Sequence, residues 1–103
     1  MAPGEVTDNN ALHRFELHVG GETAVLVYEK TEHLLRLIHT EVPQSLEGQG
    51  VGSKLVSAVL RFAQENKLSV VPLCPFVAQY VKSHPEYSAI IDPPHRWMTD
   101  SAS

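Results

Sequence analysis

The chain has 103 residues, an apolar share of 43% and a formal net charge of −4. This length accommodates one domain with a single hydrophobic core. The sequence has no run of Lys or Arg, which argues against nucleic-acid binding because such proteins need clustered cations. The single cysteine, Cys74, rules out an intramolecular disulfide.

The two ends of the chain look irregular in composition. Residues 1–12 are mostly polar and carry Pro, Gly and Asn, which predicts a flexible tail without the apolar region of a secretory signal. Residues 93–103 predict an irregular C-terminal tail, which leaves one domain over residues 13–92. No apolar stretch is long enough to span a bilayer, so we expect a cytoplasmic protein that does not bind membranes.

Three strands are predicted in the first half of the domain. Residues 15–19 alternate between apolar and polar side chains, Gly20-Gly21 is typical of a hairpin turn, and residues 24–28 are apolar and rich in valine. Residues 34–42 predict the third strand, ended by Pro43. Regular alternation would place these residues on one face of it: Leu35, Leu37, His39 and Glu41.

The second half has helical and mixed patterns. Residues 51–66 show an apolar stripe of helical period, and residues 68–73 are a short apolar run that predicts a parallel return strand. A short helix is predicted over residues 76–83 after Pro75, and a short edge strand over residues 87–91. The predicted order is β-β-β-α-β-α, an α/β domain with a mixed, mostly antiparallel sheet.

Three alternating glycines, Gly48, Gly50 and Gly52, lie between the third strand and the long helix. Glycines let a ligand approach the backbone, and the free N–H groups of a helix N-terminus favour an anion such as phosphate. A Walker loop is excluded because no Gly-Lys-Ser/Thr sequence occurs, and the chain is too short for a Rossmann series. The alternative is a flexible loop with no ligand.

Two segments resemble the acetyl-CoA motif of the GCN5-related N-acetyltransferases: His39-Thr40-Glu41-Val42-Pro43 and Glu47-Gly48-Gln49-Gly50-Val51-Gly52-Ser53-Lys54-Leu55. Pro72-Leu73-Cys74-Pro75-Phe76 and His84-Pro85-Glu86-Tyr87 are similar to the small single-domain branch described as YjdJ-type acetyltransferases. The resemblance covers about residues 14 to 91. It implies a minimal acetyltransferase fold in which the third strand and the return strand splay apart to form a coenzyme A (CoA) cleft.

The resemblance also implies which residues bind acetyl-CoA. Residues 40–42 would line the pantetheine arm, with the amide of Val42 near the thioester carbonyl, and the loop amides from Gln49 to Gly52 would bind the pyrophosphate. The full set of expected binding residues is Thr40, Glu41, Val42, Glu47, Gly48, Gln49, Gly50, Val51, Gly52, Ser53 and Lys54. Glu47 departs from the Arg or Gln of the family motif, and we expect its carboxylate to turn away from the ligand.

Catalytic roles are expected for three further residues. Tyr80 is the candidate acid, and His39, alone or with Glu41, is the candidate base, because histidine is a residue type suited to proton transfer near neutral pH. Cys74 is a candidate nucleophile, or a residue that lies close to the thiol of CoA. The structural alternatives are a packed tyrosine, a strand-end histidine and a small buried cysteine. The histidines and Cys74 show no spacing typical of a zinc site, so no metal is predicted.

The sequence therefore predicts an acetyl-CoA-dependent N-acetyltransferase acting on an amine, which could be a protein lysine, a polyamine or a small metabolite. The alternative is a CoA-binding module or interaction protein with little catalysis, and a third option is an acyl carrier that uses Cys74. We expect a monomer or weak dimer.

Overall fold

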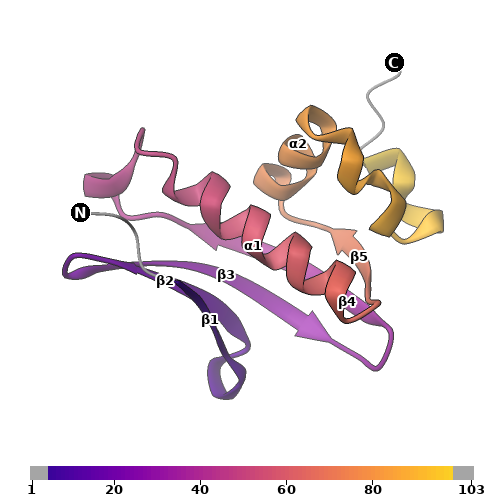
Figure 1. Cartoon of the computed structure of the whole chain (residues 1–103), viewed down its shortest axis with the longest axis horizontal. Helices are drawn as coiled ribbons and strands as arrows, with labels where there is room; N and C mark the ends of the chain where they lie inside the picture. The colour runs from indigo at the N-terminus through magenta and orange to yellow at the C-terminus, as the bar shows by residue number, and fades with distance from the viewer. Residues whose placement is uncertain (1–4, 99–103) are drawn as a thin grey trace.

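The computed structural model describes residues 5–98, which form one five-stranded sheet with helices packed on it (Figure 1). The strands are β1 (Val6–Asn9), β2 (Arg14–Val19), β3 (Glu22–Lys30), β4 (Leu34–Glu41) and β5 (Ser69–Pro72), and the α-helices are α1 (Val51–Glu65) and α2 (Pro75–Ser83). Short 3₁₀ helices span Asn10–Leu12, Gln44–Leu46, Pro85–Ile90 and Pro93–Met98. The sheet order follows the chain, and only the β4–β5 pair is parallel. This confirms the mixed, mostly antiparallel α/β fold.

Strand β1 lies within the segment predicted as a flexible tail, so that prediction was wrong for these residues. β1 pairs antiparallel with β2, with Val6 opposite Leu17. The buried Tyr28 hydroxyl donates to Asp8 Oδ1 at 2.5 Å and lies 3.0 Å from Asn10 Oδ1. Because these contacts come from distant residues, local composition does not indicate the strand.

The C-terminal part also differs from the expectation. Residues 85–90 form a 3₁₀ helix instead of an edge strand, and only Ile91 bridges to Val70. Pro93–Met98 is a 3₁₀ helix, while residues 99–103 of the predicted tail lie outside the described residues. Within residues 5–98, no helix has the length and apolar character needed to cross a membrane.

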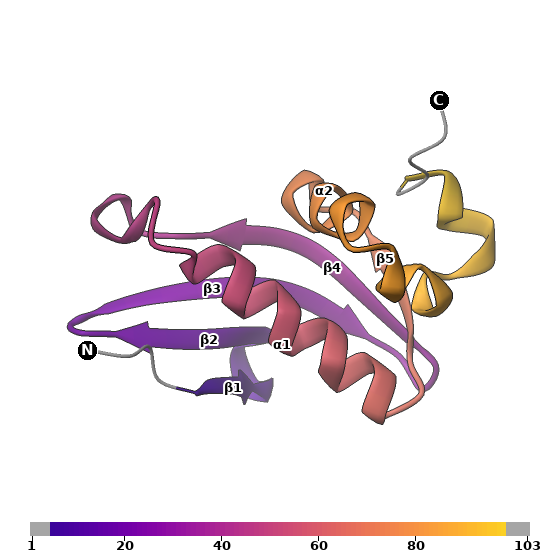
Figure 2. The same ribbon diagram turned by 45° about the horizontal axis from the view of Figure 1, so that its top comes forward.

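The hydrophobic core lies between α1 and one face of the sheet. The buried residues of α1 form the predicted stripe: Val51, Gly52, Leu55, Val56, Val59, Leu60 and Ala63. They pack against fully buried sheet residues that include Leu17, Leu26, Leu35 and Leu37. Helix α2 lies beside α1 next to β5, and no helix in the described part of the chain covers the opposite face of β2 and β3 (Figures 1 and 2).

A β-bulge interrupts the β3–β4 ladder. Val27 pairs with His39 and Tyr28 pairs with Leu37, so Ile38 has no partner in β3. One extra residue reverses the alternation of side chains. The prediction of one face for Leu35, Leu37, His39 and Glu41 was therefore wrong. After the bulge, Thr40 lies on the α1 side, opposite the buried Leu26, and His39 and Glu41 face away.

Strands β4 and β5 separate at this bulge. Their last paired residues are Leu37 and Pro72, and the Cys74 amide donates to the Leu37 carbonyl at 2.9 Å. Beyond that bond, the described residues pair no strand with this edge of β4. A cleft therefore opens between the end of β4 and the first turns of α1 and α2.

Candidate functional site

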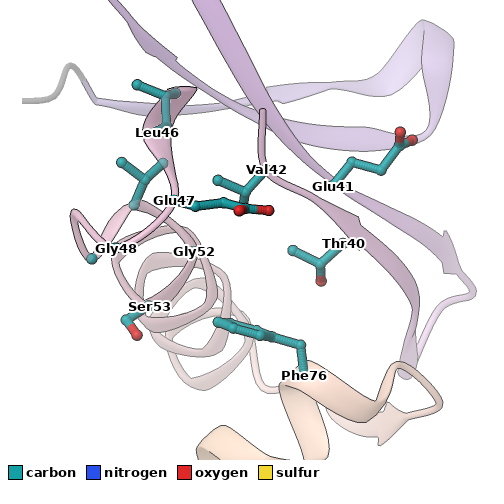
Figure 3. Close-up of a pocket in the computed structure, with 11 residues that line it drawn as sticks. Thr40, Glu41, Val42, Leu46, Glu47, Gly48, Gly52, Ser53 and Phe76 are labelled. Carbon is teal, nitrogen blue, oxygen red and sulfur yellow. The ribbon is translucent and has the colours of Figure 1, made fainter. Parts of the chain in front are cut away.

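The cleft is a cavity of about 560 Å³, within the usual size range of small-molecule sites (Figure 3). Its walls come from the end of β4, the glycine loop, the first turn of α1 and the first turn of α2. The lining residues are Thr40, Glu41, Val42, Leu46, Glu47, Gly48, Gly50, Val51, Gly52, Ser53 and Phe76. The structure thus brings together most of the residues expected from sequence to bind the ligand.

The N-terminus of α1 opens into this cleft with its amides free of helical partners. The first intrahelical bond runs from the Lys54 amide to the Gly50 carbonyl, 3.0 Å, so the amides of residues 51–53 precede the ladder. Gly50 is the N-cap and offers no side-chain acceptor, and the first turn has no acidic residue. The positive end of the helix dipole therefore faces the cavity without an internal counter-charge, which suits an anion.

The three glycines of the loop occupy two different structural environments. Gly48 and Gly50 adopt φ of 81° and 75°, in the left-handed region, and nothing lies within 4 Å of where a Cβ would be. Gly52 has no such backbone requirement. Instead, a Cβ there would lie 2.9 Å from Phe76 Cζ, closer than real Cβ contacts allow.

Two of the expected binding residues do not line the cleft. The Gln49 amide donates to the Leu46 carbonyl at 3.3 Å, and its side chain donates to the Ser45 carbonyl at 3.0 Å. Gln49 therefore stabilises the loop, and its amide is already bonded in this structure. Lys54 is exposed one residue beyond the lining Ser53.

Glu47 lines the cleft, and its carboxylate does not turn outward as expected. Figure 3 shows the side chain extending from the loop across the cavity towards Val42. Glu47 is exposed to solvent and has extended backbone dihedrals. A negative charge thus stands at the mouth of a cavity whose helix amides favour anions.

Cys74 lies beside the cleft without lining it. Its side chain is 4% exposed, and Sγ lies 3.2 Å from Thr40 Oγ1 across the gap between β4 and α2. Cys74 is also the N-cap residue of α2, although its side chain caps no amide there. The Thr40–Cys74 contact closes the inner end of the splay.

The other two catalytic candidates also stand outside the cavity wall. The Tyr80 ring stacks on His84 at 4.0 Å between centroids, and His84 Nδ1 bonds to the Tyr80 carbonyl at 2.9 Å. His39 is exposed on the opposite face of the sheet, with Nε2 3.6 Å from Glu41 Oε2. His39 therefore lies across β4 from the main cleft, whereas Glu41 is part of the cleft wall.

A second, smaller cavity of about 310 Å³ lies on that opposite face. It is lined by Arg14, Thr23, Val25, Glu41, Val42 and Pro43. Glu41 and Val42 therefore line both cavities. The end of β4 is the wall between them.

Sequence reasoning missed two residues of the main cleft, Leu46 and Phe76. The available signal for Phe76 was a large aromatic residue placed directly after the helix-opening Pro75. Leu46 gave no comparable signal, because an apolar residue between Pro43 and the loop is also typical of the core. Within residues 5–98, no group of three or more His, Cys, Asp or Glu side chains is placed to hold a metal ion.

Known proteins share this sequence pattern. Residues 14–90 match the family model described as GCN5-related N-acetyl-transferase. Protein NATD1 of Homo sapiens is 33% identical over 86 residues, which cover 81% of this chain and 76% of the human protein. Protein NATD1 of Gallus gallus and of Mus musculus show the same identity over 86 residues and 78% of their length.

Proposed function

The chain belongs to the GCN5-related N-acetyltransferase family, and we propose that it transfers an acetyl group from acetyl-CoA to an amine. The observation that carries this proposal is the uncapped N-terminus of α1, whose free amides at residues 51–53 open into a cavity of ligand size. Backbone donors and a helix dipole suit the pyrophosphate of CoA. The left-handed Gly48 and Gly50 leave room for phosphate to approach the backbone.

The arm of the donor would then extend along the end of β4. Thr40 and Val42 line that part of the cavity, on the edge of β4 that β5 no longer pairs. A free strand edge offers the backbone groups that the amides of pantetheine need. We place the thioester carbonyl near the Val42 amide, where a fixed N–H would stabilise the developing oxyanion.

Acetyl transfer requires two proton movements. The amine nitrogen attacks the thioester carbonyl carbon, the carbon–sulfur bond breaks, the amine proton passes to a base, and the departing sulfur takes a proton. His39 and Glu41 are our candidates for the base because Glu41 lines both cavities and His39 Nε2 lies 3.6 Å from its Oε2 on the face that carries the second cavity. We propose that the amine approaches from this face. We also propose that Tyr80 or Cys74 donates a proton to the departing sulfur.

Ser53→Glu is a sharp test of the anion site. Ser53 lines the cleft in the first turn of α1, where a carboxylate stabilises the helix dipole but repels a phosphate. We expect thermal unfolding at an unchanged or higher temperature, together with weaker CoA binding by calorimetry. Gln64→Glu, exposed near the other end of the same helix, adds the same charge and should leave CoA binding unchanged. No CoA binding by the wild type would refute the proposal.

A CoA-binding module with little catalysis is the second candidate. The observation that favours it is that Cys74, Tyr80 and His39 do not line the main cleft. A panel of amines assayed for released CoA separates the two functions. If wild type and Ser53→Glu release CoA at equal rates with each amine while only the wild type binds CoA, the module is favoured. An acyl carrier would instead show an acetyl adduct by mass spectrometry that is lost in Cys74→Ala.

A further inference from the structure

Phe76 is an exposed aromatic residue that lines the main cleft. It follows Pro75 in the first turn of α2, and its side chain is 44% exposed, whereas Val77 and Val81 of the same helix are buried. Leu73, three residues earlier, is similarly exposed at 43% but does not line the cleft. Two apolar side chains of equal exposure therefore differ in whether they face the cavity.

The Phe76 ring lies against the first turn of α1. Figure 3 shows it reaching from α2 across the floor of the cavity towards Gly52, below Thr40. A Cβ at Gly52 would lie 2.9 Å and 3.3 Å from two carbons of the ring, and 3.4 Å from Val42 Cγ2. Val42 and the ring therefore both lie close to Gly52, and all three line the cavity.

This position lies between the two parts of the cavity. On one side are the helix amides and the glycine loop, which suit phosphate, and on the other is Thr40 at the inner end of the splay. The ring lines the same cavity as both regions, so it is within reach of a chain that connects a phosphate on the amides to a group near Thr40. The exposed ring offers that chain an apolar surface, which phosphate itself does not need.

We propose that Phe76 is a specificity-determining residue that packs against the pantetheine arm and so favours CoA and its thioesters over the nucleotide half of CoA. This inference rests on the proposed function, because it takes CoA as the ligand. The gem-dimethyl and methylene groups of the arm are the apolar groups that the ring would cover. The bare Cα of Gly52 is what lets the ring lie low enough to leave space above it.

Calorimetry with two ligands tests the inference. The ligands are CoA and 3′-phosphoadenosine 5′-diphosphate, which has the phosphates and adenosine of CoA but no arm. Phe76→Ala should weaken CoA binding roughly ten-fold and leave binding of the nucleotide unchanged. Leu73→Ala, matched in exposure but outside the cavity, should change neither.

The outcomes separate this inference from the function it rests on. If the wild type does not bind CoA, the proposed function fails and the inference falls with it. If the wild type binds CoA and Phe76→Ala affects both ligands equally, or neither, Phe76 only supports the structure and the inference alone is wrong. If the alanine variant does not fold, Phe76→Leu keeps an apolar side chain for folding but offers the arm less apolar surface than the ring, so it should weaken CoA roughly three-fold and leave the nucleotide unchanged. Unchanged CoA affinity in that variant would also overturn it.

Discussion

Replacing Glu47 with glutamine should strengthen CoA binding. The carboxylate extends across the mouth of the cavity, where the free amides of residues 51–53 would hold phosphate. Because Glu47 is exposed, the effective dielectric constant is near that of water, and two like charges about 4 Å apart repel by about 1 kcal/mol. Removing that repulsion corresponds to a roughly five-fold lower dissociation constant.

Salt is the second variable in this experiment. CoA binding by the wild type and Glu47→Gln should be compared by calorimetry at about 0.1 M and about 1 M salt. The affinity advantage of Glu47→Gln should be smaller at the higher salt concentration, because the screening length falls from about 10 Å to about 3 Å. Glu65→Gln removes the same charge at the far end of α1 and should have no effect. Weaker CoA binding by Glu47→Gln, or an equal gain in Glu65→Gln, would refute the reasoning.

Three further predictions concern stability, each measured by urea unfolding. Gly50→Ala should lose about 1–2 kcal/mol, because alanine is strained at φ of 75°, and an unchanged midpoint would contradict this. Tyr28→Phe should lose about 1 kcal/mol and speed hydrogen exchange in β1, since the hydroxyl tethers that strand; unchanged exchange would argue against the tether. Hydrogen bonds from Arg14 and Asn9 hold the pKa of Glu16 below its usual value. The ionised carboxylate therefore stabilises the fold at pH values above the pKa of Glu16 in the unfolded chain. This stabilisation is lost as the pH falls through the lower pKa of Glu16 in the folded protein. In Glu16→Gln, the free energy of unfolding should therefore fall less steeply as the pH is lowered. A fall as steep as in the wild type would contradict this.

The parts of the fold that follow from local pattern were predictable from sequence. The stripe of α1 repeats at helical spacing, and the glycine loop stands between a strand and that helix, so both could be located without tertiary information. The family motif added the splay between β4 and β5. The stripe and the loop are each encoded by residues close together in the chain.

The errors arose where distant residues decide the structure. The bulge at Ile38 depends on how β4 aligns with Val27 and Tyr28, and the alternation rule assumes that no residue is skipped. The strand β1 likewise depends on its pairing with β2 and is tethered by Tyr28, which lies 20 residues from Asp8. Neither pairing leaves a mark in the local composition.

The contact between Gly52 and Phe76 is a third case of this kind. From sequence, the three loop glycines look equivalent, and all suggest backbone freedom. In the structure, only Gly48 and Gly50 need that freedom, while a Cβ at Gly52 would lie 2.9 Å from an aromatic ring of another helix. The partner of a glycine is invisible until the two helices are placed together.

The uncapped start of α1 has a consequence for the energetics of the free domain. Gly50 supplies no side-chain acceptor, and its left-handed φ of 75° is not the extended conformation from which a serine or aspartate caps a helix, so the amides of residues 51–53 stay open in the free domain. A bound phosphate would supply the missing acceptors, so the ligand itself would complete the helix. Stability would then rise with the logarithm of ligand concentration above the dissociation constant, and the melting temperature of the domain would report how much donor is present.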